Sequence, residues 1–221
     1  AKLEHSFFAE GNGGFQVEGE SAYLSVPEVA NFCIVAGRNI TVDIHPATDM
    51  QTVNLYLLGS GLGCVLHQRG ALPLHGNGIN IDNKAVVVAA HSGVGKSTLA
   101  GEFFRRGYSL LADDVCAIRD ENMVQPSYPF LKLWQNSLLS LNIPQKDLIR
   151  ITVQKEKFYV PLNQQFNTEP LPLKSIYIIT RNDELASPTL NPLKGMNKLH
   201  MLRPHIYRLH FLQRLEGGAP A

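Results

Sequence analysis

This chain has few cysteines, almost no excess charge of either sign and no long apolar run. Each of these features disfavours a class of protein. The three cysteines, Cys33, Cys64 and Cys116, are an odd number without a CxxC pair, which disfavours a disulfide framework and a structural zinc site. Reduced thiols in a cytoplasmic protein are the simplest account. Twenty Lys and Arg against nineteen Asp and Glu give a net charge of +1, which disfavours general binding to nucleic acid or to a membrane surface. No run of about 18 apolar residues is present, and the first residues lack a secretory-signal pattern.

The composition is that of an ordinary globular protein. Of 221 residues, 44% are hydrophobic and 18% are charged. Residues 1–49 contain short apolar runs broken by turn residues, which predicts a small antiparallel β-rich region. Near Thr52 the apolar spacing changes to that of one helical face, so we expect a helix over 50–68 that leads into a core spanning 50–221.

The middle of the chain alternates between strand and helix signals. Two β runs, 72–81 and 84–90, are joined by an Asp-Asn pair, which suits a hairpin. A glycine-rich stretch and a helix over 97–106 follow, and then a strand over 108–112. This order predicts an α/β fold.

The last third is less regular. Residues 175–180 predict a buried strand, and 196–212 have weak helical character. Residues 144–170 are polar, so we expect this stretch to be partly mobile. Residues 125–134 contain two prolines, which indicates an ordered loop or an edge strand.

Residues 90–97 match the phosphate-binding loop, with alanine in place of its first glycine. Gly93 and Gly95 allow the tight turn that points successive N–H groups at phosphate oxygens, and the following helix presents its positive end to the same anion. Lys96 can reach the β and γ phosphates, and the Ser97 hydroxyl can bind Mg²⁺. The apolar run before the loop and the amphipathic helix after it are the context that the motif requires. The predicted nucleotide-binding residues are Ser92, Gly93, Val94, Gly95, Lys96, Ser97 and Thr98.

Asp113 and Asp114 follow the next apolar run. A carboxylate at the carboxyl end of a strand faces the ligand crevice of an α/β sheet. One of the pair could hold Mg²⁺, and the other could accept a proton from an attacking hydroxyl. The alternative is a solvated acidic turn, because aspartate favours turns.

His75 is a third candidate, because it precedes the hairpin whose second strand leads into the glycine-rich loop. Its imidazole could stabilise phosphate charge or orient an acidic partner. A hydrogen-bonded sheet histidine is an equal alternative. His91 lies inside the loop and ranks lower.

Three stretches together resemble the HPr kinase/phosphorylase superfamily. They are residues 74–76, 92–100 and 106–115, and seventeen positions separate Lys96 from Asp113. The strong match covers about 70–118. Residues 128–134 and the N-terminal β layer look most like the HPr-kinase-like proteins of lasso-peptide biosynthetic clusters.

The resemblance implies a P-loop core akin to phosphoenolpyruvate carboxykinase, with a small N-terminal β-rich layer. It also implies a kinase that uses ATP and Mg²⁺ and phosphorylates a serine hydroxyl, there the C-terminal serine of a precursor peptide. Carried over by position, Lys96 and Ser97 serve phosphate and Mg²⁺, Asp113 is the general base, Asp114 supports the metal, and His75 matches the active-site histidine. The implied partner is a peptide or small protein with an acceptor serine, and a homo-oligomer is left open.

The chain also departs from that superfamily. It lacks the Glu-Ile-Arg-Gly signature downstream of the Asp pair, so one metal ligand is unassigned, and HPr as substrate and phosphorylase activity are both disfavoured. Lys132 and Trp134 could contribute to the site instead, although a buried Trp anchor is an equal reading. Arg203 and Arg208 could clamp a phosphate or an acidic peptide terminus. The alternative, which is commoner for arginines on a helix, is that both side chains are solvated.

Two further patterns are weaker. The glycine-rich segment 59–63 lies within helical apolar spacing, so close helix packing explains it better than dinucleotide binding. His200, His205 and His210 recur every five residues, which scatters them around a helix and makes a metal site improbable.

Several functions stay open on this basis. The first is a serine kinase acting on a peptide or protein, including an HPr-type protein kinase, because phosphoryl transfer depends mainly on positioning and charge neutralisation. The second is a nucleotide-binding regulator without phosphotransfer. A small-molecule kinase is a third, because the acceptor pocket cannot be read from sequence.

Overall fold

The chain divides into two compact units. The computed structural model describes residues 3, 6–9, 13–152, 155–184 and 186–217. Unit 1 comprises Ala1–Leu72 and Arg208–Ala221, and unit 2 comprises Pro73–Tyr207. The units therefore divide near residue 72 and not near residue 49, and the helical segment expected over 50–68 belongs to unit 1.

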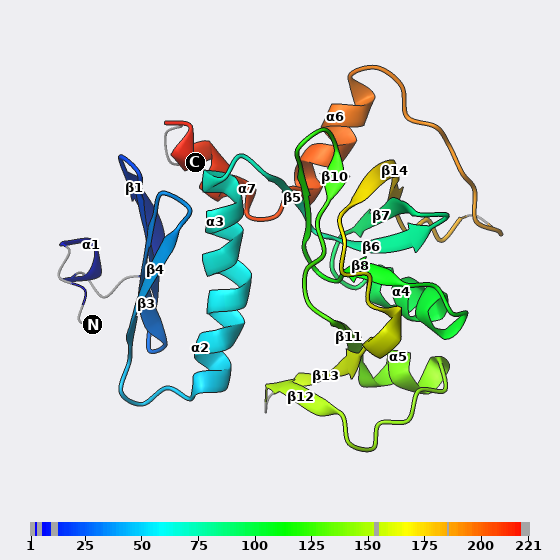
Figure 1. The fold of residues 1–221 in the computed structure, drawn as a ribbon, viewed down its shortest axis with the longest axis horizontal. Coiled ribbons are helices and arrows are strands. Elements are labelled where there is room, and N and C mark those ends of the chain that lie inside the picture. The colour runs from blue at the N-terminus through cyan, green and yellow to red at the C-terminus, as the bar shows by residue number, and fades with distance from the viewer. Residues whose placement is uncertain (1–2, 4–5, 10–12, 153–154, 185, 218–221) are drawn as a thin grey trace. The chain divides into compact units, whose positions relative to one another are not determined.

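Unit 1 is an antiparallel sheet with helices, as Figure 1 shows. The strands, in the order β1-β2-β3-β4, are Gly14–Glu18, Ser21–Val26, Ala30–Val35 and Asn39–Ile44. The helices are α1 (Ser6–Ala9), α2 (Met50–Tyr56), the π-helix η1 (Leu57–Gly61), α3 (Leu62–Gln68) and α7 (Leu209–Leu215). Apolar side chains of the sheet, α3 and α7 form one core. The expected β-rich N-terminal region and the helix over 50–68 are both confirmed.

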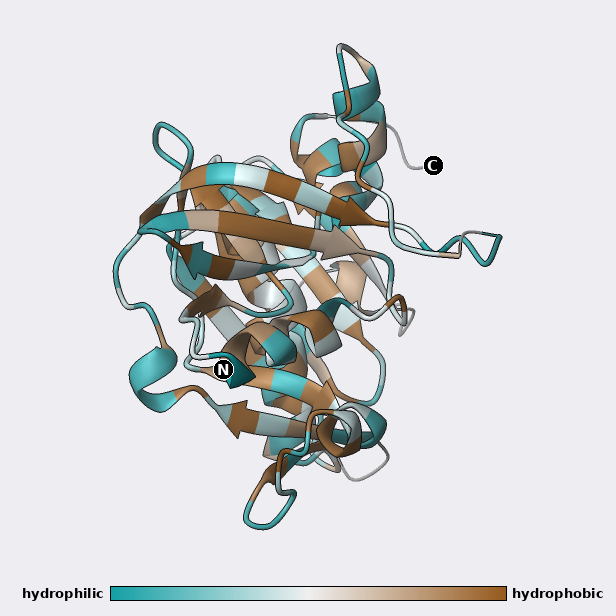
Figure 2. Ribbon diagram, turned by 90° about the vertical axis from the view of Figure 1, so that its right-hand side faces the viewer, coloured by the Kyte–Doolittle hydropathy of each residue, from teal (hydrophilic) through white to brown (hydrophobic). Residues whose placement is uncertain are grey.

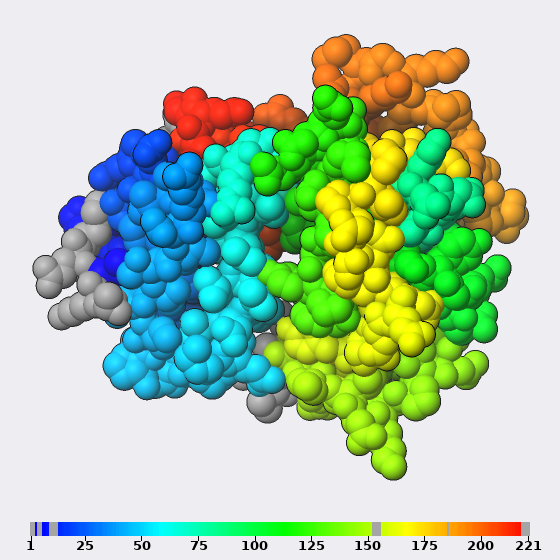
Figure 3. All heavy atoms as spheres, in the orientation of Figure 1, coloured from blue at the N-terminus to red at the C-terminus, as the bar shows by residue number. Residues whose placement is uncertain are grey.

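Unit 2 contains a mixed seven-stranded sheet. Its strands, in the order β5-β9-β10-β14-β7-β6-β8, are Leu72–Leu74, Cys116–Arg119, Met123–Val124, Leu171–Ile179, Lys84–Ala90, Gly76–Ile81 and Leu110–Ala112. β14 is parallel to β7, and β6 is antiparallel to both β7 and β8. The carboxyl ends of β7, β8 and β14 therefore lie at one edge of the sheet. The space-filling view shows the yellow segment with β14 beside the teal segment with β6 and β7 (Figure 3).

The predicted hairpin is confirmed. β6 and β7 pair from Gly76↔Ala89 to Ile81↔Lys84. The two linking residues, Asp82 and Asn83, have φ of 55° and 56°. Two positive φ values are what a type I′ turn requires, and such a turn matches the twist of the strands.

A smaller sheet and two helices complete the core of unit 2. The sheet has the order β11-β13-β12, with strands Phe130–Trp134, Lys155–Pro161 and Ile149–Thr152. Helix α4 (Lys96–Arg105) packs against β11, and α5 (Gln135–Ser140) follows that strand. Apolar residues of both helices and of this sheet share a core with β6, β7 and β8. The hydropathy colouring shows brown bands on many strands and teal on most connecting loops (Figure 2).

Two expectations for the last third were wrong in part. The polar stretch 144–170 contains the paired strands β12 and β13 and a short 3₁₀ turn, η2 (Asn163–Gln165). Residues 175–179 belong to a strand, which ends one residue before the expected limit at 180, but β14 is half-buried and Tyr177 is 42% exposed. The weakly helical segment is α6 (Asn197–Leu202) and η3 (Arg203–His205), and its last part belongs to α7.

The mixed α/β class is therefore confirmed, and a P-loop core of the HPr kinase type stays a prediction. No helix within the described ranges has both the length and the apolar character needed to cross a membrane.

Candidate functional site

The glycine-rich loop connects β7, which ends at Ala90, to α4, which begins at Lys96. Gly93 and Gly95 have φ of 87° and 108°, values that residues with a Cβ rarely adopt. A Cβ added at either glycine would meet no atom within 4 Å, so the loop faces open space. Gly95 is the helix N-cap and supplies no side chain, which leaves the first-turn N–H groups of α4 without a side-chain cap. The loop therefore has the backbone and the space that an anion needs.

Lys96 is the first residue of α4, and it is only 7% exposed. Its Nζ lies 3.4 Å from Nε2 of His75, and in the described part of the chain it forms no ion pair within 4 Å. Burial lowers the pKa of Lys96, and the carboxylates of Asp114 and Asp113 oppose that shift through space. A buried cation without a contacting carboxylate is costly, and a bound phosphate would supply the missing negative charge.

Asp113 follows β8 directly, at the edge of the sheet where β7 leads into the loop. Its side chain is buried, with 6% exposure. One carboxylate oxygen accepts a hydrogen bond from the Asn77 amide, and the other accepts from the backbone N–H of Lys132 at 2.6 Å. Burial, and then the charge of Asp114, raise the pKa of Asp113 above its ordinary value. A raised pKa makes this carboxylate a better proton acceptor.

Asp114 has a different environment. Its backbone is left-handed, with φ of 75°, which is uncommon for a residue with a Cβ. Its Oδ2 lies 3.0 Å from Nζ of Lys132, and its Oδ1 lies 3.5 Å from Nδ1 of His75. Burial acts to raise the pKa of Asp114, but the charges of Lys132 and Lys157, together with the hydrogen bond from Lys132, outweigh it and hold this pKa below the ordinary value. Asp114 therefore stays anionic, as a metal ligand must.

His75 connects Lys96 to Asp114. Its Nδ1 lies 2.9 Å from the carbonyl oxygen of Asp114, so Nδ1–H is the donor and Nε2 accepts from Lys96. Burial, and then the charge of Lys96, lower the pKa of His75. The imidazole is thus neutral at pH 7, and this hydrogen-bond pattern assigns its tautomer.

The structure brings some of the predicted site residues into contact and leaves others apart. Lys96, Asp113, Asp114, His75 and Lys132 form one connected cluster. The Thr98 hydroxyl lies 2.8 Å from that of Ser137 in α5, so it contacts protein. Ser92 and Gly93 of the loop are exposed, Val94 of the loop is half-buried, and Ser97 is half-buried in the first turn of α4.

Other candidates lie outside this cluster. Trp134 is 47% exposed, so a buried Trp anchor is wrong, and Nζ of Lys157 lies 5.7 Å from its ring centre. Arg203 is an exposed residue of unit 2, whereas Arg208 belongs to unit 1. The glycine-rich segment 59–63 lies within the helical stretch formed by η1 and α3, as expected.

Sequence reasoning missed three residues. Asn77 holds Asp113, and Lys157 acts on the pKa of both aspartates. His205 is buried, its carbonyl oxygen accepts from the backbone N–H of His75 at 2.7 Å, and its ring lies 4.8 Å from that of His91. The periodic histidines were judged only against a metal site, and no local pattern links residue 205 to residue 75.

A metal ion at this site would depend on the nucleotide as well as on protein. Among the described residues, no group of three or more His, Cys, Asp or Glu side chains could hold a metal ion. Mg²⁺ is often held by only one or two carboxylates together with substrate phosphates. Ser97 and Asp114 are the side chains that fit this role, because one follows the glycine-rich loop and the other keeps its negative charge.

Comparisons with known proteins give little support for assigning this chain to a family. No family model matches this chain, and no curated protein matches it. A solved structure, the Hpr(Ser) kinase/phosphatase from Coxiella burnetii, is similar to 55% of this chain over 73% of its own length, with 18% identity and a TM-score of 0.35. A likeness at this level shows neither a family nor an activity, so the functional assignment depends on the residues of the site.

Proposed function

We propose that this protein is a kinase that transfers the γ-phosphate of Mg-ATP to a serine hydroxyl of a peptide or small protein. The observation that carries the proposal is the pairing of a glycine turn and buried Lys96 with Asp113 and Asp114, whose pKa values shift in opposite directions. Groups with opposed pKa shifts at one site are typical of a proton acceptor beside a permanent charge.

Each group has a distinct role in this proposal. The loop amides and Lys96 neutralise phosphate charge, and Ser97 and Asp114 hold Mg²⁺. Asp113 accepts the hydroxyl proton while the serine oxygen bonds to the γ-phosphorus and the bond from that phosphorus to the bridging oxygen breaks, releasing ADP. His75 is a positioning residue, because its neutral ring orients Lys96 and the backbone of Asp114.

A peptide acceptor is favoured by the surface of the small sheet near Lys132. The rings of Tyr128 and Phe130 are stacked 5.6 Å apart, and Tyr159 meets Phe130 edge-on at 4.7 Å. Phe130 and Tyr159 belong to the same strand pair as Lys132, whose Nζ contacts Asp114, and Tyr128 lies just before that pair. The backbone N–H of Lys132 also donates to Asp113, the proposed proton acceptor, and an aromatic face beside that residue suits a peptide segment better than a small polar metabolite. The finer proposal is a C-terminal serine, as in a lasso-peptide precursor.

Mass spectrometry tests both levels of this proposal. The full chain is incubated with Mg-ATP and three peptides that differ only at the last residue, which is serine, alanine or an amidated serine. We expect the mass of one phosphoryl group to be added to the serine peptide and not to the alanine peptide. Equal modification of the amidated peptide would remove the requirement for a free terminus, and an absence of modification with all serine peptides would contradict the peptide kinase.

A nucleotide-binding regulator is the second candidate. Both carboxylate oxygens of Asp113 already accept hydrogen bonds, which favours a structural carboxylate over a free base. ATP binding at micromolar concentration without phosphorylation of any acceptor would support the regulator.

A further inference from the structure

The small sheet of unit 2 has an inner face and an outer face. Alternate residues of β11 and β13, among them Leu133 and Phe158, are buried in the core of unit 2. Side chains of a strand point alternately to the two faces of a sheet, so the residues between them lie on the outer face. The outer-face residues of this strand pair are Phe130, Lys132, Trp134, Lys157 and Tyr159. None of these five is acidic, so this part of the outer face is aromatic and cationic.

The outer face is continuous with the proposed phosphotransfer site through Lys132. The backbone N–H of Lys132 donates to Asp113, the proposed proton acceptor, and its Nζ lies 3.0 Å from Oδ2 of Asp114. A segment bound on the outer face could therefore present a hydroxyl to Asp113. The occupant of this face is then the acceptor of the phosphate.

The two lysines of the outer face differ in what neutralises them. Lys132 forms an ion pair with Asp114, whereas Lys157 forms none within 4 Å among the described residues. Lys157 is half-buried, and solvent screens a partly buried charge less than an exposed one. The charge of Lys157 is therefore available to a carboxylate of a bound molecule.

The charge of Lys157 also reaches the proposed site. Burial is the largest influence on the pKa of each of four groups there, and the charge of Lys157 acts on all four towards a lower pKa. These groups are His75, Lys96, Asp113 and Asp114. An anion paired with Lys157 would thus lie close to the reacting groups.

Trp134 marks the position of that anion. It is directly opposite Lys157 in the strand pair, and Nζ of Lys157 lies 5.7 Å from the centre of its ring. The ring attracts the ammonium but has no net charge, so it does not neutralise the lysine. The indole is 47% exposed, which leaves apolar surface for a bound segment. A cation beside an exposed ring suits an acidic peptide better than a basic one.

The strand geometry sets the spacing. Lys132, which contacts both aspartates, lies two residues before Trp134 on β11. Two residues of an extended chain span about 7 Å. An extended peptide with its hydroxyl at Asp113 would therefore bring the side chain two positions away to Lys157.

We propose that the outer face binds an acidic acceptor peptide, in which a carboxylate two residues from the acceptor serine pairs with Lys157 beside Trp134. This rests on the proposed function, because it identifies the substrate class of the same site. Lys157 is then a specificity-determining residue that acts on peptide binding.

Tryptophan fluorescence of the full chain tests this proposal without requiring transfer. Trp134 is the only tryptophan of the chain, so its emission reports on this face alone. The probes are seven-residue peptides with blocked ends and a central serine, which carry glutamate two residues before it, glutamate two residues after it, or glutamine or lysine at both positions. We expect one glutamate peptide to shift the emission to shorter wavelength and to bind about fivefold more tightly than the glutamine peptide, the upper end for an exposed ion pair. The lysine peptide should bind more weakly than the glutamine peptide.

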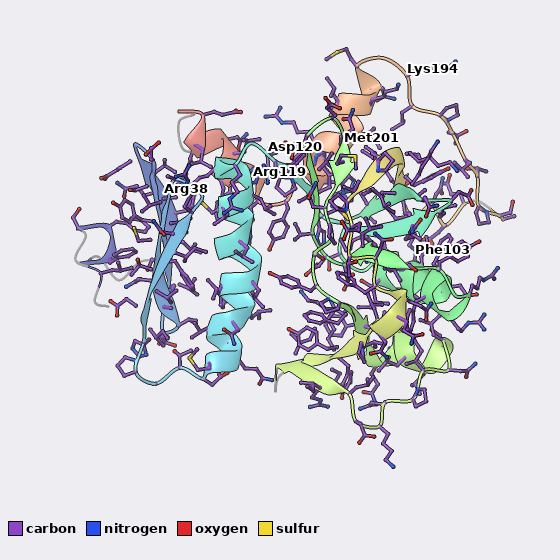
Figure 4. All side chains as sticks on the ribbon, viewed as in Figure 1. Arg38, Phe103, Arg119, Asp120, Lys194 and Met201 are labelled. Atoms are coloured by element: carbon purple, nitrogen blue, oxygen red, sulfur yellow. The ribbon has the colours of Figure 1, made fainter. Side chains whose placement is uncertain are left out.

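Matched variants locate the preference. Lys157→Gln should abolish the difference between the glutamate and glutamine peptides, and Lys157→Arg should retain it. Lys194→Gln, which changes an exposed lysine of the same unit away from β11 and β13 (Figure 4), should also retain it. Equal binding of all four peptides, no binding of any of them, or an unchanged preference in Lys157→Gln would overturn the proposal.

Phosphorylation of the same peptides separates this proposal from the proposed function. A preference for glutamate that depends on Lys157, without transfer of phosphate to any peptide, would support the acidic-peptide surface and contradict the kinase. Equal phosphorylation of all four peptides without a change in Trp134 emission would support the kinase and overturn the acidic-peptide surface.

Discussion

The two units differ in what they bury. Among the described residues, unit 2 buries a lysine and an aspartate, Lys96 and Asp113, together with Asn77 and His205, whereas the buried polar side chains of unit 1 are Ser25, Ser60 and His67. Burying a charge is costly unless it is paired and hydrogen-bonded. Unit 2 therefore accepts an electrostatic cost at one sheet edge that unit 1 avoids, and such a cost is typical of a functional site.

The strand directions explain why the charges gather there. β7 and β8 run the same way because both are antiparallel to β6, so the residues after each strand reach the same edge. Lys96 follows β7 and Asp113 follows β8. The four described strands of unit 1 are all antiparallel and joined by short turns, so the ends of neighbouring strands lie at opposite edges of that sheet.

The largest expected effect is at Asp113. Asp113→Asn removes the proposed proton acceptor, so we expect phosphate transfer to fall about 10²–10⁴-fold while ATP affinity changes only a few-fold. Single-turnover phosphorylation and ATP calorimetry measure the two quantities. Near-normal turnover of this variant would show that Asp113 is not the general base and would favour the nucleotide-binding regulator.

The second effect is at Lys96. Lys96→Ala removes the buried cation, so both ATP affinity and transfer rate should fall, the rate by about 10²–10³-fold. The matched control is Lys198→Ala, an exposed lysine of the same unit. If the two variants bind ATP equally well, Lys96 does not contact phosphate.

Alanine substitutions at one glycine in each unit compare how tightly the two sheets are packed. A Cβ at Gly76 of β6 would lie 2.8 Å from the carbonyl oxygen of Val88, whereas, among the described residues, a Cβ at Gly14 of β1 would meet only Phe7, at an ordinary 3.5 Å. Gly76→Ala should therefore destabilise the protein by about 1–3 kcal/mol, and Gly14→Ala should be neutral or slightly stabilising. Urea unfolding measures both, and equal stability of the two variants would show that β6 can shift.

The smallest effect concerns Lys132. Burial acts to raise the pKa of Asp114 and Lys132 is the main group that lowers it, so Lys132→Met should raise this pKa. The acid limb of the kcat/KM profile should then move to higher pH, because Asp114 must be ionised to act. At pH 7 we expect a loss of about tenfold. An unchanged acid limb would show that Asp114 does not control it.

Local signals predicted much of this structure. The helix over 50–68, the turn at Asp82 and Asn83, and the placement of Lys96 and Asp113 near one edge all follow from short patterns. The partners of the site did not follow, because Asn77 and His205 reach it only through long-range sheet pairing.

Two other features were missed for similar reasons. The strands β12 and β13 appeared mobile because their exposed faces are polar, yet alternate residues such as Phe158 and Val160 are buried. Arg203 belongs to unit 2 and Arg208 to unit 1, because the segment from Arg208 onward belongs to unit 1. No sequence pattern marks this change of unit.

The most direct test of the central claim is a crystal structure with a non-hydrolysable ATP analogue and Mn²⁺, located by its anomalous signal. We predict that the phosphates lie within hydrogen-bond distance of the amides of the loop from Gly93 to Ser97, and that Mn²⁺ lies about 2.1 Å from the Ser97 hydroxyl oxygen, the distance expected for Mg²⁺. Asp114 should bind the metal directly or through water. A triphosphate bound elsewhere, or a metal ion distant from both Ser97 and Asp114, would contradict the account.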